Sequence, residues 1–261
     1  MSIITLTTDL GTKDHYVAII KGEIHKQLKD INIVDISNDI RKFDIQEAAF
    51  VFKNCYKHFP EGTVHIIGVN EELTNEHQHL AVQINNQFII GPDNGIFSLI
   101  FDELFPDKIV QLNIPLGSDT LTFAIKDVFI KAACHFVRGG TIEMIGDPLT
   151  DFQNKSASLK AVIGPNSIRG SIMHIDSYGN ATTNIDKNLF NRIGKGREFE
   201  ILYGKETENI NKIVDKYKDV SEGERLAIFS TNNLLEISMN QGKANELLGL
   251  EIYDIIRIEF K

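Results

Sequence analysis

The sequence lacks the features that mark membrane-spanning, nucleic-acid-binding and secreted proteins. Its longest apolar runs cover a few residues, whereas a membrane-spanning helix needs roughly 18–20. Basic residues form no dense cluster in a chain of net charge −9, and phosphate backbones are bound by clustered cations. The opening MSIITLTTDLG has neither the basic start nor the apolar stretch of a signal peptide. We therefore expect no membrane span, no nucleic-acid partner and a cytoplasmic location.

Cysteine is scarce, and the familiar catalytic motifs are missing. Cys55 and Cys134 lie in helix-like segments and are expected to be buried thiols of a reducing compartment. The chain has no GxxxxGK[ST], no GxGxxG after its first strand, no HExxH and no GxSxG. His77 and His79, with His65 nearby in sequence, leave a zinc site as an alternative, but no clear third ligand accompanies the pair. We expect no metal.

The chain does contain enough apolar residues for one large domain or two ordinary ones: 42% of its 261 residues are hydrophobic and 24% are charged. Strand-like and helix-like segments alternate at 2–8, 14–29, 31–36, 44–57 and 63–69. This order predicts a mostly parallel sheet with helices on its faces. In the second helix, Asp44 is the expected N-cap and Glu47 would complete a capping box.

Turn signals organise the rest of this first part. Residues 80–90 are typical of a hairpin that turns at Asn85-Asn86. The run GPDNG at 91–95 breaks the chain before a helix expected near 96–104. A last helix is expected over 127–138 and is stopped by a glycine pair.

The composition changes after about residue 150. The segment DFQNKSASLK is polar and small, as in a linker. Short strand-like runs separated by turn residues follow at 168–175, 181–185, 198–203, 225–230, 234–239 and 252–259. The predicted fold is therefore α/β, with an N-terminal α/β domain over 1–151, a linker over 152–166 and a C-terminal all-β barrel domain over 167–261.

Candidate ligand-binding side chains occur at strand ends and turns. Asp9 stands at the expected carboxyl end of the first strand, where ligands of open parallel sheets bind and a carboxylate can accept hydrogen bonds from a ribose diol. Asp14 can simply be a charge at the start of a helix, whereas a carboxylate after an apolar strand needs partners. Asp93-Asn94 and 176–180 are equally typical of turns, and Glu236 with Asn240 of a strand exit and a cap.

Six segments in the same order together resemble the S-adenosylmethionine (SAM) hydroxide adenosyltransferase family, which also includes the fluorinase and chlorinase. The segments are Thr8-Asp9-Leu-Gly-Thr-Lys-Asp14-His-Tyr-Val with Lys21-Gly22; Val34-Asp35-Ile36-Ser37 with Phe43-Asp44-Ile45; Phe59-Pro60-Glu61-Gly62-Thr63-Val64-His65; Gly91-Pro-Asp-Asn-Gly95; Ile175-Asp176 through Gly179-Asn180-Ala-Thr-Thr-Asn184-Ile185; and Leu235-Glu236-Ile237 through Asn240-Gln-Gly-Lys-Ala244 and Leu248-Gly249. The resemblance spans nearly the whole chain.

The resemblance implies a homotrimer with each site between one subunit's N-terminal domain and a neighbour's C-terminal domain. It implies that Asp9 binds the ribose hydroxyls, that Phe43 packs on the ligand, that Asp176 binds the methionine amino group and that Asn180 binds the adenine. Ser230 and Thr231 stand where the methionine carboxylate is held, although Asn232-Asn233 follow them where the family often has Arg or Gly. The expected binding residues are Asp9, Asp14, Phe43, Asn94, Asp176, Asn180, Ser230, Thr231 and Asn240.

The family's reaction is an in-line displacement of methionine from the ribose 5′-carbon. The sulfonium leaves as a neutral thioether, so the reaction needs no general acid, no metal and no cofactor beyond SAM as substrate. What it needs is a nucleophile held in line with bulk water excluded.

The hydrolytic members position water with an Asp, an Arg and a His, and all three differ here. The corresponding positions are Asn70, His77 (or Gln78) and Ala124. The halogenase pattern is also missing, because its Tyr, Thr and Ser positions fall at Asn70, about Leu73 and Ile125.

Several functional interpretations therefore stay open. The first is SAM hydrolysis to adenosine and methionine, with Asn70, Glu71 or His77 orienting water; of these, Asn70 and His77 are the expected catalytic residues. The second is adenosyl transfer to another nucleophile, and the third is a catalytically impaired SAM or adenosine binder. Outside these, the chain could be a structural trimer with a vestigial cleft, or a zinc-dependent hydrolase using His65, His77 and His79.

Overall fold

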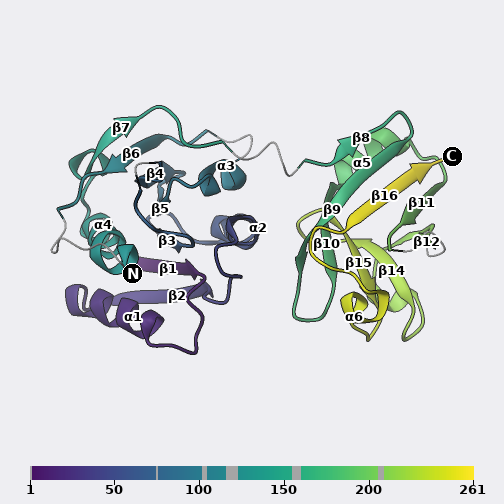
Figure 1. Cartoon of the computed structure of the whole chain (residues 1–261), viewed down its shortest axis with the longest axis horizontal. Coiled ribbons are helices and arrows are strands. Elements are labelled where there is room, and N and C mark those ends of the chain that lie inside the picture. The colour runs from purple at the N-terminus through teal and green to yellow at the C-terminus, as the bar shows by residue number, and fades with distance from the viewer. Residues whose placement is uncertain (1, 75, 102–104, 116–122, 155–159, 205–208) are drawn as a thin grey trace. The chain divides into compact units, whose positions relative to one another are not determined.

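The computed structural model describes residues 2–74, 76–101, 105–115, 123–154, 160–204 and 209–261. The chain divides into two compact units, Met1–Ser156 and Ala157–Lys261 (Figure 1). The boundaries expected from the sequence, at 151 and 166, stay predictions, as does the linker, part of which lies outside the described residues.

The first unit is built on a seven-stranded sheet in the order β2-β1-β3-β5-β4-β6-β7. Its strands are β1 (Ser2–Thr8), β2 (Ile31–Ser37), β3 (Val64–Gly68), β4 (His79–Ile84), β5 (Gln87–Pro92), β6 (Lys108–Leu112) and β7 (Gly146–Leu149). Strands β2, β1, β3 and β5 are mutually parallel, while β4 is antiparallel to both β5 and β6. The predicted mostly parallel sheet is thus confirmed; β6 and β7 were not predicted.

Helices cover both faces of this sheet (Figure 1). They are α1 (Tyr16–Gln27), α2 (Ile45–Lys53), η1 (Tyr56–His58), α3 (Ile96–Phe101), η2 (Ile125–Phe129), α4 (Ile130–Val137) and η3 (Ile142–Met144). Helices α1 and α4 pack together against one face, and α2 packs with α3 on the other. Apolar residues of β1, β3, α1, η2 and α4 form one continuous core. The helix expected over 127–138 begins earlier, as a π-helical turn in η2, and residues 102–104 of the helix expected near 96–104 lie outside the described residues.

The start of α2 confirms one capping prediction and changes the other. The Asp44 side chain accepts from the backbone N–H groups of Gln46 and Glu47, at 3.0 and 2.9 Å. The Glu47 carboxylate accepts from the backbone N–H of Arg41 at 2.8 Å, while the Asp44 N–H donates to the Arg41 carbonyl. The helix start is therefore fixed to the segment that precedes it, which carries Lys42 and Phe43.

The second unit is a nine-stranded, mostly antiparallel sheet that curls into a nearly closed barrel. Its strands are β8 (Val162–Ile163), β9 (Ser167–Ile175), β10 (Ala181–Asp186), β11 (Phe199–Leu202), β12 (Asn209–Ile210), β13 (Ile213–Val214), β14 (Arg225–Phe229), β15 (Leu234–Met239) and β16 (Ile255–Phe260). The barrel prediction is confirmed. Helices α5 (Lys187–Gly194) and α6 (Ala244–Leu248) and the 3₁₀ turn η5 (Tyr217–Asp219) were not predicted.

In the described part of the chain, no helix is both long and apolar enough to cross a membrane.

Candidate functional site

The carboxyl ends of the parallel strands β1, β3 and β5 meet at one edge of the first unit's sheet, and Asp9 lies at the end of β1. Its side chain is buried, and its Oδ2 accepts the backbone N–H of Phe43 at 2.8 Å. The backbone N–H of Asp9 donates to the carbonyl of Gly68 at 3.4 Å, and the Lys42 ammonium donates to the Asp9 carbonyl. Asp9 is thereby fixed between the end of β3 and the segment before α2.

Phe43 lies in an unusual backbone conformation beside Asp9. Its φ is +63°, in the left-handed region that costs a bulky side chain about 1–3 kcal/mol, and the residue is 71% exposed. Strain of this kind persists where surrounding contacts enforce it, here the hydrogen bond to Asp9. The arrangement presents an aromatic ring to solvent next to a buried carboxylate, which suits packing on a ligand. Asp14 is exposed just before α1, whose N-cap is His15.

Asn94 supports the loop that follows β3. Its side chain is buried, and its Nδ2 donates to the carbonyls of Val69 and Asn70, at 3.1 Å each. Its Oδ1 accepts the N–H of Ile96, the first residue of α3. In the described contacts Asn94 thus acts as a positioning residue for Asn70, which has a φ of +50°. Asparagine tolerates that conformation.

His77 lies beside Asp93, and it is Asp93 that belongs to the loop following β5. Burial raises the pKa of Asp93, whereas the N–H of Gln153 and the nearby His77 lower it. The backbone N–H of His77 donates to the Thr74 hydroxyl at 2.9 Å. The structure therefore brings His77 close to a half-buried carboxylate.

Glu71 is one of the three residues that the sequence left open for orienting water, and it was not among the expected catalytic residues. Its carboxylate accepts the backbone N–H of Ile125, at the start of η2, and lies near Asp9. Burial raises the pKa of Glu71 to about 7, with a further contribution from the charge of Asp9 and an opposing one from the Ile125 N–H. A carboxyl group that is half ionised near neutral pH at a strand edge marks a candidate functional residue. Gly68 at the end of a buried strand was the available signal, because a glycine there leaves room for another group.

Ala124, at the family's histidine position, is a core residue. It is 3% exposed and packs with Ile125 and Val128 in the main core of the first unit. Thr122 of the same segment lies outside the described residues.

The histidines of the zinc alternative have other partners. The His65 Nδ1 is 2.7 Å from the Thr5 hydroxyl, and burial lowers the pKa of His65 to about 4. The His79 Nε2 is 2.9 Å from the Glu71 carbonyl oxygen. Across the described ranges, no three His, Cys, Asp or Glu side chains are grouped so as to hold a metal ion.

In the second unit, Asp176 and Asn180 form one hydrogen-bonded turn after β9. The Asp176 Oδ1 accepts the N–H groups of Tyr178 and Asn180, at 2.9 Å each, and its Oδ2 accepts the Asn180 Nδ2 at 3.0 Å. Gly179 has a φ of +84°, and a Cβ there would lie 2.4 Å from the Asn245 Oδ1. The turn is therefore rigid, with its carboxylate and amide already in contact.

Ser230, Thr231 and Asn240 lie at the ends of the β14–β15 hairpin. The Ser230 hydroxyl donates to the Asn232 Oδ1 at 2.5 Å, and Thr231 is exposed. The buried Asn240 donates through Nδ2 to the carbonyl of Val220 at 2.8 Å. The geometry leaves the Thr231 side chain accessible to a ligand, whereas Asn240 anchors a neighbouring loop.

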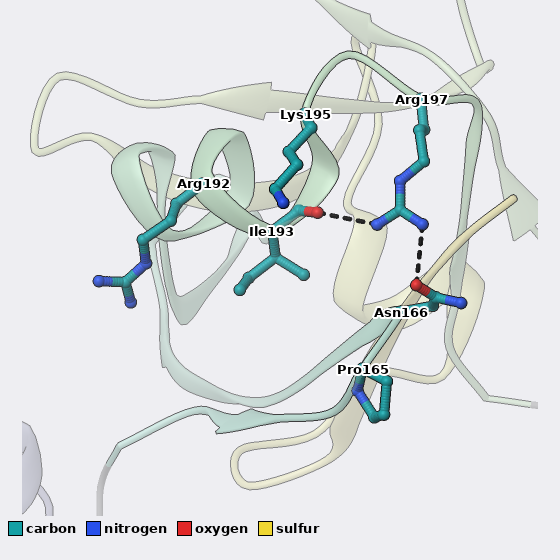
Figure 2. Close-up of a pocket in the computed structure, with 6 residues that line it drawn as sticks. All are labelled: Pro165, Asn166, Arg192, Ile193, Lys195 and Arg197. Carbon is teal, nitrogen blue, oxygen red and sulfur yellow. Dashed lines mark hydrogen bonds between the residues drawn. The ribbon is translucent and has the colours of Figure 1, made fainter.

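A pocket of about 370 Å³ in the second unit lies away from these residues (Figure 2). It is lined by Pro165, Asn166, Arg192, Ile193, Lys195 and Arg197. The guanidinium of Arg197 donates to the carbonyl of Ile193 and to the Asn166 side chain, each at 2.9 Å (Figure 2). Because Arg197 ties the end of α5 to the chain before β9, the pocket is explained by the packing of this helix.

The chain combines an α/β unit, which has polar side chains at one edge of its sheet, with a β-barrel unit. Comparisons with known proteins show which family has this combination of units. The family model for the SAM hydroxide adenosyltransferase N-terminal domain matches residues 4–146, and the model for the C-terminal domain matches residues 170–257. The chain therefore belongs to the SAM hydroxide adenosyltransferase family, as its motifs predicted.

Individual relatives agree with the family models over almost the whole length. An (R)-S-adenosyl-L-methionine hydrolase of Methanocaldococcus jannaschii is 28% identical, covering 99% of this chain and 96% of that protein. Another hydrolase of the same name, from Thermus thermophilus, is 26% identical over 94% of each chain. The solved structure of an uncharacterized conserved protein from Thermotoga maritima has a TM-score of 0.87 at 25% identity, covering 99% of both chains.

Proposed function

We propose that this chain is an enzyme that cleaves SAM at the ribose 5′-carbon by nucleophilic substitution with water, giving adenosine and methionine. The observation that carries the proposal is Asp9, a buried carboxylate at the end of β1 within a chain that matches both family models. A carboxylate there can accept hydrogen bonds from the ribose diol and fix the sugar. Held in this way, the 5′-carbon can be aligned with a nucleophile, which is the main catalytic requirement of the reaction.

The rest of the site is part of the same proposal. Phe43 packs on the ligand, Asp14 and Asn94 belong to the N-terminal half of the site, and Asn70 and His77 lie on the side of the nucleophile. From the C-terminal domain, the turn of Asp176 and Asn180 and the hairpin residues Ser230, Thr231 and Asn240 bind the methionine and adenine ends. The hydrogen bonds that order this turn and hairpin support preorganised binding groups.

The assembly and location are inferred from the family. We infer a cytoplasmic homotrimer with intersubunit sites, no nucleic-acid partner and no cofactor beyond SAM as substrate. Domain boundaries at residues 151 and 166 complete the proposal. Sedimentation of the full chain tests the oligomeric state, and a monomer at micromolar concentration would contradict shared sites.

Product analysis tests the activity itself. Full-length protein incubated with SAM is expected to yield adenosine and methionine in equal amounts by chromatography. No product over hours at high protein concentration would exclude hydrolysis.

A catalytically impaired binder is the second candidate, and Ala124 favours it. An apolar residue in the core replaces a histidine that positions water in the hydrolytic members. This candidate predicts that calorimetry detects SAM or adenosine binding while no adenosine is produced.

A further inference from the structure

The Glu71 side chain occupies space that Gly68 leaves open at the end of β3. A Cβ on residue 68 would lie 2.9 Å from the Glu71 Oε2 and 2.2 Å from the Ile125 Cδ1. Both distances are shorter than any ordinary contact, so a side chain at 68 would displace the carboxylate, the isoleucine or both. The Glu71 carboxylate therefore lies directly over the last residue of the strand.

Two contacts hold Glu71 in this position. The backbone N–H of Ile125 donates to its carboxylate, and the Nε2 of His79 lies 2.9 Å from its carbonyl oxygen. A carboxylate has two oxygens with about four acceptor sites, so one N–H leaves room for a bound water. Glu71 is thus fixed at both its backbone and its side chain.

Asp9 places Glu71 beside the expected substrate. The two carboxyl groups are close enough for the charge of Asp9 to act on Glu71. The backbone N–H of Asp9 also donates to the carbonyl of Gly68, the residue over which the Glu71 carboxylate lies. If Asp9 holds the ribose diol, Glu71 lies at the same edge of the sheet. Asn70 contributes its carbonyl to Asn94, and His77 lies beside Asp93.

We propose that Glu71 binds and orients the water that attacks the ribose 5′-carbon, the task for which hydrolytic members of the family use an aspartate at the position of Asn70. This assignment rests on the proposed function. The water oxygen forms a bond to the 5′-carbon as the bond from that carbon to sulfur breaks, with its electron pair going to sulfur. Neutral methionine leaves, and the proton released by the water passes through Glu71 to solvent.

The ionisation of Glu71 fits this task. With a pKa of about 7, the group is ionised often enough near neutral pH to accept a proton and to release it again. The charged and titratable groups near it in the described residues are Asp9, which follows β1, and His79 of β4; the Lys42 ammonium donates to the Asp9 carbonyl.

The test compares Glu71→Gln with Glu72→Gln, an exposed neighbour in the same loop. The glutamine keeps an acceptor for the Ile125 N–H but carries no charge. We expect Glu71→Gln to lower kcat by about 10²–10⁴-fold, the usual contribution of a positioned acid–base group, with SAM affinity by calorimetry within about threefold of wild type. Glu72→Gln is expected to keep wild-type values of both.

A pH profile provides the readout that a structural role would not give. In wild type, kcat/KM is expected to rise with pH to a plateau, with a midpoint near 7, and this rise is expected to be absent from Glu71→Gln. Because both proteins are measured on the same substrate, titration of SAM itself cancels in the comparison. A Glu71→Gln variant with wild-type kcat and an unchanged profile would overturn the assignment alone. Wild-type protein without hydrolytic activity would overturn both the proposed function and the role of Glu71.

Discussion

The partly buried carboxyl group of Glu71 makes a prediction about stability that does not depend on the reaction. Its pKa rises from an ordinary value of 4.5 to about 7 in the folded protein. Between these values the folded chain keeps a proton that the unfolded chain has released, so stability falls as pH rises from about 4.5 to about 7. The difference makes the ionised form about 3 kcal/mol less favourable in the folded protein, to order of magnitude.

Glu71→Gln removes this titration and keeps the shape of the side chain. We expect the variant to be close to wild type in stability near pH 4.5 and more stable by about 3 kcal/mol at pH 8. Urea unfolding of both proteins at several pH values measures the difference. By thermal unfolding, each kcal/mol corresponds to roughly 2–4 °C for a unit of this size.

The comparison of two matched proteins matters because other groups titrate in the same range. The pKa of His65 falls to about 4 through burial, so the neutral ring adds stability as pH rises from about 4 to about 6.5. That gain opposes the loss from Glu71 in the wild-type curve and cancels in the difference. A difference between the variant and wild type that stays constant from pH 4.5 to pH 8 would refute the reasoning.

Four further perturbations test the site and its packing. Asp9→Asn should weaken SAM binding by roughly 10–100-fold in calorimetry, since a hydrogen bond to a charged group is worth about 1.5–3 kcal/mol. The control is Asp30→Asn, which changes an exposed carboxylate before β2. Equal affinities for the two variants would contradict the site. Phe43→Gly should relieve the left-handed strain and raise stability by about 1 kcal/mol in urea unfolding. The same variant should bind SAM with lower affinity. Loss of stability would show that the ring packs within the fold. Gly68→Ala should destabilise the fold by about 1–3 kcal/mol through overpacking against Glu71 and Ile125. The kcat of this variant should also fall. An unchanged melting temperature would show that the space beside residue 68 is not tight. Ala124→His, which restores the family's residue, should cost about 1–3 kcal/mol because Ala124 is a core residue, and a wild-type melting temperature would refute this.

Periodicity and turn residues predicted most of the architecture because the signals are local. The alternating segments up to residue 69 contain apolar residues at strand or helix spacing, and the sheet assembled from them is parallel as expected. Strand β7 was missed because it begins Gly146-Asp147-Pro148 and has no period-two pattern. Helix α5 was missed because it is short and polar between strands, although Asp186 caps it through the N–H of Leu189 at 2.9 Å.

The candidate site was predictable where a residue's role follows from its place on one strand. Asp9 could be identified from the end of an apolar strand, and the motif at 91–95 from its turn residues. Glu71 lies near Asp9 and Ile125, which are about 60 and 54 residues away from it in the sequence. No local sequence pattern can predict contacts between segments so far apart. The same holds for Asn94, whose amide holds the loop after β3 from the end of β5.

The contact between Glu71 and Gly68 also bears on why the family's aspartate can be absent. Position 70 has a left-handed backbone, which both Asn and Asp tolerate, so the backbone alone does not require the change to Asn70. A carboxylate at 71 reaches the strand end only because residue 68 has no side chain. If the charge has moved by one residue, an aspartate restored at 70 would place a second anion near Asp9 and Glu71, where like charges disfavour one another. Asn70→Asp alone is therefore expected to lower, not raise, the rate of hydrolysis, whereas Asn70→Asp combined with Glu71→Gln should be faster than Glu71→Gln. A rate for Asn70→Asp above wild type would show instead that the aspartate position is vacant and that Glu71 does not fill its role.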